Sequence, residues 1–146
     1  MIKETLYTLE GIYREDFKIT GFRFGHGEKA ACVVGSLRGN EYQQTYICSQ
    51  LIKELKKLEE HGQIAVGKEI MVIPCLNHYA TNIDRRFWPL DDSDLNRRFP
   101  GMANGDTTQQ IASEIMESIK GYDYGIQLTS FYMPGNFVPH VRMMET

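Results

Sequence analysis

The strongest constraint on the fold is a change of hydrophobic period that runs from strand to helix and back to strand. Residues 29–37 are mostly apolar, and residues 69–74 form a second short apolar run that ends in a proline. Continuous runs of this kind are typical of strands covered on both faces. Between them lie apolar residues spaced three and four apart, as in an amphipathic helix: Ile47, Leu51, Leu55 and Leu58. Because a strand, helix and strand in this order close as a right-handed parallel crossover, the pattern predicts an α/β fold.

Two further segments complete the predicted sheet. Residues 17–24 alternate roughly in polarity and precede the glycine-rich turn 25–28, which predicts a β-hairpin leading into the first buried strand. Residues 124–131 are predicted to form a third parallel strand. We therefore expect one domain, residues 1–146, with a mainly parallel sheet, flanking helices and a preceding β-hairpin.

A second helix is predicted from isoleucines at four-residue spacing: Ile111, Ile115 and Ile119. Thr107 or Thr108 supplies a hydroxyl that can cap its first turn, and Gly121 stands where a helix commonly ends.

Composition excludes several classes of function. The 146 residues carry 16 Lys and Arg against 19 Asp and Glu, a net charge of −3, which is unlike a nucleic-acid-binding domain. The longest apolar runs fall far short of the ~20 residues of a membrane-spanning helix. Residues 1–5 show no basic-then-apolar leader, so we expect a cytoplasmic protein that contacts neither nucleic acid nor membrane. The three cysteines lie in apolar segments, and we expect them to be reduced core residues: Cys32, Cys48 and Cys75.

The chemistry is expected where loops gather at the carboxyl ends of the strands, because open α/β sheets bind ligands there. Residues 36–41 follow the first buried strand, and residues 129–142 follow the last one. The connection 77–106 is much longer than the ~4–6 residues usual in compact domains, and such connections are often functional.

This connection carries a motif, Asp-Leu-Asn-Arg-Arg-Phe-Pro-Gly at residues 94–101, preceded by Pro74, Asn77 and Arg86. The chain here resembles the succinylglutamate desuccinylase and aspartoacylase family, relatives of the zinc carboxypeptidases. The resemblance covers nearly the whole chain and implies a zinc-carboxypeptidase-like (phosphorylase/hydrolase-like) fold. It also implies that the substrate carboxylate is held by an Asn-Arg pair and an upstream arginine, which match Asn96, Arg97 and Arg86.

The resemblance implies a zinc site as well, and this chain departs from it. The family binds zinc through His-x-x-Glu after the first strand and through the histidine of a later Asp-x-His. The corresponding positions here hold Arg38, Glu41 and Thr129. A catalytic zinc needs about three protein ligands, and a guanidinium keeps its proton. We therefore expect Arg38 to pair with Glu41 in the zinc's place, with no metal or other cofactor, and the catalytic residues stay unknown.

The chain has four histidines: His26, His61, His78 and His140. None pairs with a second histidine or cysteine at ligand spacing, so we interpret them as solvated or hydrogen-bonded side chains. His78 and His140 lie nearest the predicted strand ends, which leaves a different metal site as a weaker hypothesis.

The resemblance also bears on length. Members of the family are about twice as long, and their catalytic glutamate comes from a strand beyond the last residue of this chain. We therefore expect the N-terminal part of a deacylase domain, truncated at its C-terminus. An exposed sheet edge would then be covered by a second copy, as a homo-oligomer, or by the missing segment.

Three hypotheses for function follow. The first is a pseudoenzyme that binds a small carboxylate or an N-acyl amino acid through Arg86, Asn96, Arg97 and Arg38. The second is an active metal-dependent hydrolase of amide or ester bonds in N-acyl amino acids, completed by other ligands or by a second chain. The third is a purely structural subunit that binds no small molecule. Its loop would be ordered by pairs between four arginines, Arg85, Arg86, Arg97 and Arg98, and four aspartates, Asp84, Asp91, Asp92 and Asp94.

Overall fold

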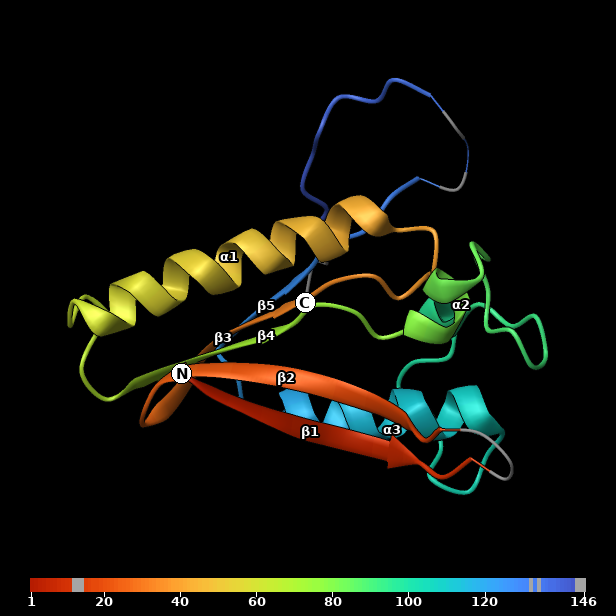
Figure 1. Ribbon diagram of the computed structural model, residues 1–146, viewed down its shortest axis with the longest axis horizontal. Coiled ribbons are helices and arrows are strands. Elements are labelled where there is room, and N and C mark those ends of the chain that lie inside the picture. Colours follow the sequence, from red (N-terminus) through yellow and green to blue (C-terminus); the bar gives the residue numbers. More distant parts are fainter. Residues whose placement is uncertain (12–14, 132, 134, 144–146) are drawn as a thin grey trace.

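The computed structural model describes residues 1–11, 15–131, 133 and 135–143, in which the strands form one sheet between helices (Figure 1). The order across the sheet is β1-β2-β4-β3-β5. The strands are β1 (Ile2–Leu9), β2 (Phe17–Gly25), β3 (Glu28–Val34), β4 (Lys68–Ile73) and β5 (Tyr124–Gln127). The helices are α1 (Tyr42–Glu60), α2 (His78–Asn82) and α3 (Thr107–Ile119), with a 3-10 turn, η1 (Leu95–Arg97).

The predicted crossover is present. β3 and β4 are parallel, with Val33 opposite Val72 and Val34 opposite Ile73, and α1 connects them. β5 pairs in parallel with the other side of β3, which confirms the third parallel strand, although it ends at Gln127 rather than at residue 131. The pairings of β1 with β2 and of β2 with β4 are antiparallel. The α/β class is therefore confirmed, but the sheet is mixed rather than mainly parallel.

The predicted hairpin was placed on the wrong pair of strands. β2 and β3 are consecutive in sequence, yet β4 lies between them, and Phe24 of β2 is opposite Ile70 of β4. The turn that joins β2 to β3 packs against the segment before β4: a Cβ atom on Gly27 would lie 2.3 Å from the carbonyl oxygen of Gly67. The hairpin of this protein is formed by β1 and β2, and β1 was not predicted.

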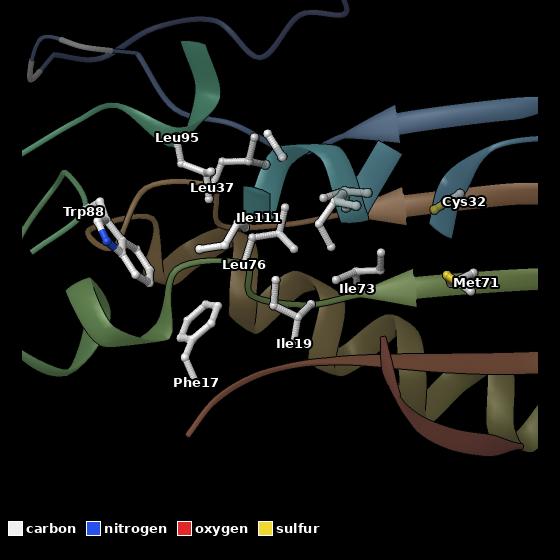
Figure 2. Packing of buried hydrophobic residues seen from close by; sticks show 13 residues of the cluster. Phe17, Ile19, Cys32, Leu37, Met71, Ile73, Leu76, Trp88, Leu95 and Ile111 are labelled. Atoms are coloured by element: carbon white, nitrogen blue, oxygen red, sulfur yellow. The ribbon is translucent and has the colours of Figure 1, made fainter. Parts of the chain in front are cut away.

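Alternation along the central strands divides the core into two layers. On one face, Cys32 of β3 and Ile73 of β4 join a cluster that includes Ile111 of α3 (Figure 2). On the other face, Val33 and Val72 pack with α1 residues such as Cys48 and Leu55. Side chains of the long 77–106 connection enter the first layer, where Trp88 and Leu95 are fully buried (Figure 2).

The buried face of α1 differs from the predicted stripe. Leu55 is buried and Leu51 is half-buried, but Ile47 and Leu58 are 42% and 39% exposed. The helix instead turns Gln44 and Cys48 toward the sheet. Which apolar residues of a helix are buried depends on the strands that it packs against. In α1 the stripe with Ile47 and Leu58 and the stripe with Gln44 and Cys48 share Leu55, and the sheet covers the second.

The start of α3 also differs from the prediction, while its end agrees. The cap is Asp106, whose carboxylate accepts a hydrogen bond from the Gln109 N–H at 2.9 Å, and the Gln109 side chain returns to the Asp106 N–H. Neither Thr107 nor Thr108 serves as the cap. Gly121, with a φ of 87°, follows the end of the helix as expected.

The cysteines and the sheet edge complete the description. The three cysteines are free, and burial raises the pKa of the Cys32 thiol to about 12. β5 lies at the sheet edge, and all four of its residues are exposed; oligomerisation through this edge stays a prediction. No helix of the described residues is long and apolar enough to cross a membrane.

Replacing Ile111 by alanine should destabilise the fold strongly. Ile111 lies on the buried face of α3 and is 0% exposed. Truncating a buried isoleucine to alanine costs about 2–5 kcal/mol. Ile47→Ala is the matched control, because it makes the same change in a helix at a position that is 42% exposed. Urea unfolding should place the control within about 1 kcal/mol of the parent chain. Equal losses for the two variants would contradict the assignment of the buried faces.

Candidate functional site

The turn after β3 brings the first group of predicted site residues into the structure. The Gly35 N–H donates to the carbonyl of Ile73, and the Ser36 hydroxyl donates to the carbonyl of Glu41, which closes the turn over residues 36–41. Gly39 packs directly against α2, since a Cβ atom there would lie 2.4 Å from the Cβ atom of Ala80. The turn therefore holds Arg38 and Glu41 in a fixed, buried position.

Arg38 is bound chiefly by Asp94 of the long connection. Its Nε atom lies 3.2 Å from both carboxylate oxygens of Asp94, and its Nη2 atom lies 3.0 Å from Oδ2. The two side chains are 9% and 13% exposed. Asp94 also accepts a hydrogen bond from the Asn96 N–H and so begins the η1 turn. One carboxylate thus joins Arg38 to the motif that contains Asn96 and Arg97.

Glu41 is the second carboxylate at this point, and its side chain is fully buried. Its Oε1 atom lies 3.6 Å from Nη1 of Arg38, so the expected Arg38–Glu41 pair is present. The same oxygen accepts hydrogen bonds from the Thr129 hydroxyl at 2.9 Å, the Ser130 N–H at 3.0 Å and the Ser130 hydroxyl at 3.1 Å. Oε2 accepts the Arg38 N–H at 3.2 Å. The structure therefore brings together the three positions predicted from the family's zinc ligands.

Asn96 and Arg97 lie on the outer side of this network. The Gln127 amide, at the end of β5, donates to Oδ1 of Asn96 at 2.6 Å. The Arg97 side chain is 83% exposed, with Nε 3.7 Å from Asp94. Its guanidinium is therefore open to a ligand, whereas that of Arg38 faces Asp94, Glu41 and Thr129. Direct contact between Arg38 and a ligand stays a prediction. Several N–H groups of its guanidinium already donate to Asp94 and Thr129 and are not available to a ligand.

Arg86 approaches the same turn from the long connection. Its carbonyl accepts the Gly39 N–H at 3.1 Å. Arg86 lines a pocket of about 470 Å³, together with Asn40 and Ser130. Within the described part of the chain, the Arg86 guanidinium makes no ion pair, and its one cation-π neighbour is the adjacent Phe87.

The arginine and aspartate pairing of the structural hypothesis is found only in part. Arg97 pairs with Asp94, but Arg98 pairs with Asp106, which was not among the expected partners. The carboxylate of Asp84 instead accepts a hydrogen bond from the Tyr42 hydroxyl at 2.7 Å.

The histidines lie apart from this network or are occupied elsewhere. His78 stacks on Phe17 with ring centroids 4.5 Å apart, and burial lowers the pKa of its imidazole. His140 lies 5.3 Å from the Phe131 ring. Among the described residues, no group of three or more His, Cys, Asp or Glu side chains is placed to hold a metal ion.

Two contacts of the site were missed from the sequence. Asp94 was considered only as one of several loop aspartates, although it opens the motif that carried the resemblance. Gln127 stands where the family's Asp-x-His has its aspartate, two residues before Thr129, and was not predicted as a site residue. Both residues lie in motifs that the sequence analysis used, so each could have been considered. The motifs alone, however, do not show that Asp94 binds Arg38 or that Gln127 binds Asn96.

Residues 28–128 match the sequence model of a protein family, the succinylglutamate desuccinylase/aspartoacylase catalytic domain. The chain belongs to this family. The match begins at β3 and ends directly before Thr129, so it contains Arg38, Glu41 and the whole long connection. The resemblance inferred from the sequence is confirmed, and with it the deacylase-type domain.

Individual relatives agree with this assignment. N-alpha-acetyl-L-2,4-diaminobutyric acid deacetylase of Halomonas elongata is 30% identical over 94 residues, covering 64% of this chain and 25% of the enzyme. An aspartoacylase family protein of Mesorhizobium loti matches with a TM-score of 0.69 and 29% identity over 84% of this chain and 38% of that one. A metallo-carboxypeptidase of Pseudomonas aeruginosa shares the fold at a TM-score of 0.62 and 16% identity, over 86% and 34%. The chain therefore spans less than half the length of each.

Removing the Arg38 guanidinium should destabilise the protein far more than removing that of Arg97. Arg38→Met leaves the buried Glu41 carboxylate without a cation and leaves Asp94 with only the exposed Arg97, a change that costs about 3–5 kcal/mol. Arg97→Met removes only an exposed partner of Asp94, for which ~0–1 kcal/mol is expected. Chemical unfolding of the two variants measures the difference, and equal unfolding midpoints would contradict the central place of Arg38.

His78 should make the protein less stable as the pH falls. Burial lowers the pKa of the folded imidazole below its ordinary value of 6.5. The unfolded chain then binds a proton more readily, so the free energy of unfolding decreases as the pH falls from 6.5 toward the folded pKa. His78→Phe, which can still stack on Phe17, should flatten this decrease when unfolding is measured from about pH 7.5 to 5.5. The control is His26→Asn at an exposed turn position, and an unchanged pH dependence in His78→Phe would contradict the assignment.

Proposed function

We propose that this chain is a carboxylate-binding member of its family, which holds a small carboxylate or an N-acyl amino acid without hydrolysing it by a zinc route. The observation that carries the proposal is the bidentate contact between Arg38 and Asp94, beside a Glu41 carboxylate whose oxygens both accept hydrogen bonds from the protein.

The donor set at the three family ligand positions does not fit zinc. Zinc is bound in proteins by thiolate, imidazole and carboxylate ligands, with about three needed at a catalytic site. A guanidinium has no free electron pair and keeps its positive charge. The Thr129 hydroxyl donates its hydrogen to Glu41 rather than offering a lone pair to a cation. Of the three positions, only Glu41 carries a residue type that commonly binds zinc.

The predicted carboxylate-binding residues, by contrast, retain groups that suit an anion. Arg86 has no ion-pair partner among the described residues, and Arg97 is largely exposed. Guanidinium groups pair with carboxylates through two parallel hydrogen bonds. The hydrogen bond from Gln127 engages Oδ1 of Asn96, which leaves the Asn96 amide hydrogens available to an acceptor. The ligand class agrees with the name of the Halomonas elongata relative, which is a deacetylase of an N-acetylated amino acid.

A titration with N-acetylglycine, the simplest N-acyl amino acid, tests the binding half of the proposal. Calorimetry on the full chain should detect binding, and Arg86→Ala should weaken it by about 10- to 150-fold, the equivalent of about 1.5–3 kcal/mol for a charge-assisted hydrogen bond. Arg85→Ala is the matched control, because it removes the neighbouring arginine, which is exposed and makes no ion pair among the described residues. No binding by the parent chain, as the structural-subunit hypothesis expects, would overturn this half.

A zinc titration of the same protein tests the other half. We expect no micromolar binding by the parent chain. The double variant Arg38→His with Thr129→His should gain zinc affinity, seen as a zinc-dependent rise in its melting temperature, because it supplies two imidazoles beside Glu41. Micromolar zinc binding by the parent chain would overturn the proposal. So would chelator-sensitive release of an amino acid from an N-acyl substrate that is abolished by Glu41→Gln, which is the result expected of an active hydrolase.

A further inference from the structure

The pocket lined by Arg86 has a second, apolar wall. Besides Arg86, Asn40 and Ser130, it is lined by Phe131, Met133 and Phe137 from the segment after β5. Phe137 and Met133 remain 45% and 53% exposed, although both are large apolar side chains. Exposed apolar surface beside a cation that lacks an ion pair is the composition expected of a site for an amphipathic anion.

The two phenylalanines form a defined surface. Their rings stack with centroids 4.1 Å apart and planes 22° from parallel. Arg142 lies over the Phe131 ring, 5.5 Å from its centroid, and supports it by a cation-π contact. At Gly135 a Cβ atom would lie 3.0 Å from the Phe137 ring, so a glycine at this position lets that ring pack closely against the backbone of residue 135.

The charge of the pocket limits what it can take. Arg86 is the one charged residue of its lining among the described residues. The other polar lining residues are Asn40 and Ser130, and the Ser130 hydroxyl already donates to Glu41. One guanidinium can satisfy one carboxylate. Arg142 lies over the Phe131 ring but outside the lining, so a second carboxylate against Met133 and Phe137 would lose hydration without a lining cation to pair with. The volume of about 470 Å³ lies within the range usual for small-molecule sites.

We infer that this pocket selects N-acyl amino acids that carry one carboxylate and an apolar side chain. The carboxylate binds Arg86, and the apolar side chain packs on Phe131 and Phe137. An aromatic side chain suits the surface best, because aromatic rings gain from offset stacking beyond the area they bury. The inference rests on the proposed function and adds the substrate class to it.

The test compares three ligands on the full chain by calorimetry. N-acetylphenylalanine should bind about tenfold more tightly than N-acetylglycine, since an added apolar group in such a site gives a gain of this order. N-acetylaspartate should bind no more tightly than N-acetylglycine. Phe137→Ala, at a position that is 45% exposed, should reduce the ratio between the first two ligands to about threefold or less. Val138→Ala, at a neighbouring residue that is 82% exposed, is the control and should leave the ratio unchanged.

The outcomes separate this inference from the proposal beneath it. If N-acetylglycine binds and depends on Arg86 but N-acetylphenylalanine binds no better, the apolar selection is wrong and the proposed function stands. Tighter binding of N-acetylaspartate, or a ratio that survives Phe137→Ala, would likewise overturn the inference alone. Failure of all three ligands to bind would overturn both.

Discussion

The buried contact between Arg38 and Asp94 is the interaction on which the rest of the site depends. Asp94 and Glu41 bring two carboxylates to one region, with side chains 13% and 0% exposed, and Arg38 is the cation placed between them. Two carboxylates in such a place repel each other and lose hydration, so a positive group there is a requirement of the fold as much as of any ligand. The hydroxyl and N–H donors of Thr129 and Ser130 supply the remaining partners of Glu41.

This network also explains how a connection as long as 77–106 keeps one conformation. Trp88 and Leu95 are buried in the core layer that contains α3 (Figure 2). Asp94 stands directly before Leu95 and is bound to the turn after β3, while Asn96 follows and is bound to β5 through Gln127. The buried Leu95 side chain therefore anchors this segment in the core, and the hydrogen bonds of Asp94 and Asn96 on either side fix its orientation against the turn after β3 and against β5. Asn96 and Arg97 are held at the surface because the residue between Asp94 and Asn96 is held in the core.

The sequence predicted the parts of this fold that depend on local periodicity. The β3-α1-β4 crossover and α3 each follow from spacing within a single segment, and both are present. The sheet order could not be obtained in this way, because the insertion of β4 between β2 and β3 depends on pairing between segments far apart in sequence. The burial of Cys48 rather than Ile47 is a similar case, since it depends on the strands beneath α1. For the candidate site, the motif predicted Arg86, Asn96 and Arg97 as binding residues. The family's zinc-ligand positions predicted the Arg38–Glu41 contact. That Asp94 is the main partner of Arg38 could be learned only from the structure.

The four arginine and asparagine positions first grouped as one binding set are physically different. Arg38 meets Asp94, Glu41 and Thr129 in a nearly dry environment, so a ligand carboxylate would have to compete with partners already in place. Arg97 is exposed, and an exposed guanidinium exchanges water for an anion with little net gain. Arg86 lies between these extremes: it is half-buried, lines a pocket and has no ion-pair partner among the described residues. A cation that has lost part of its hydration without gaining a counter-ion is the one whose free energy an incoming carboxylate lowers most. Partial burial without an ion-pair partner, rather than membership of the motif, is therefore the reason we propose Arg86 as the residue that binds the ligand carboxylate.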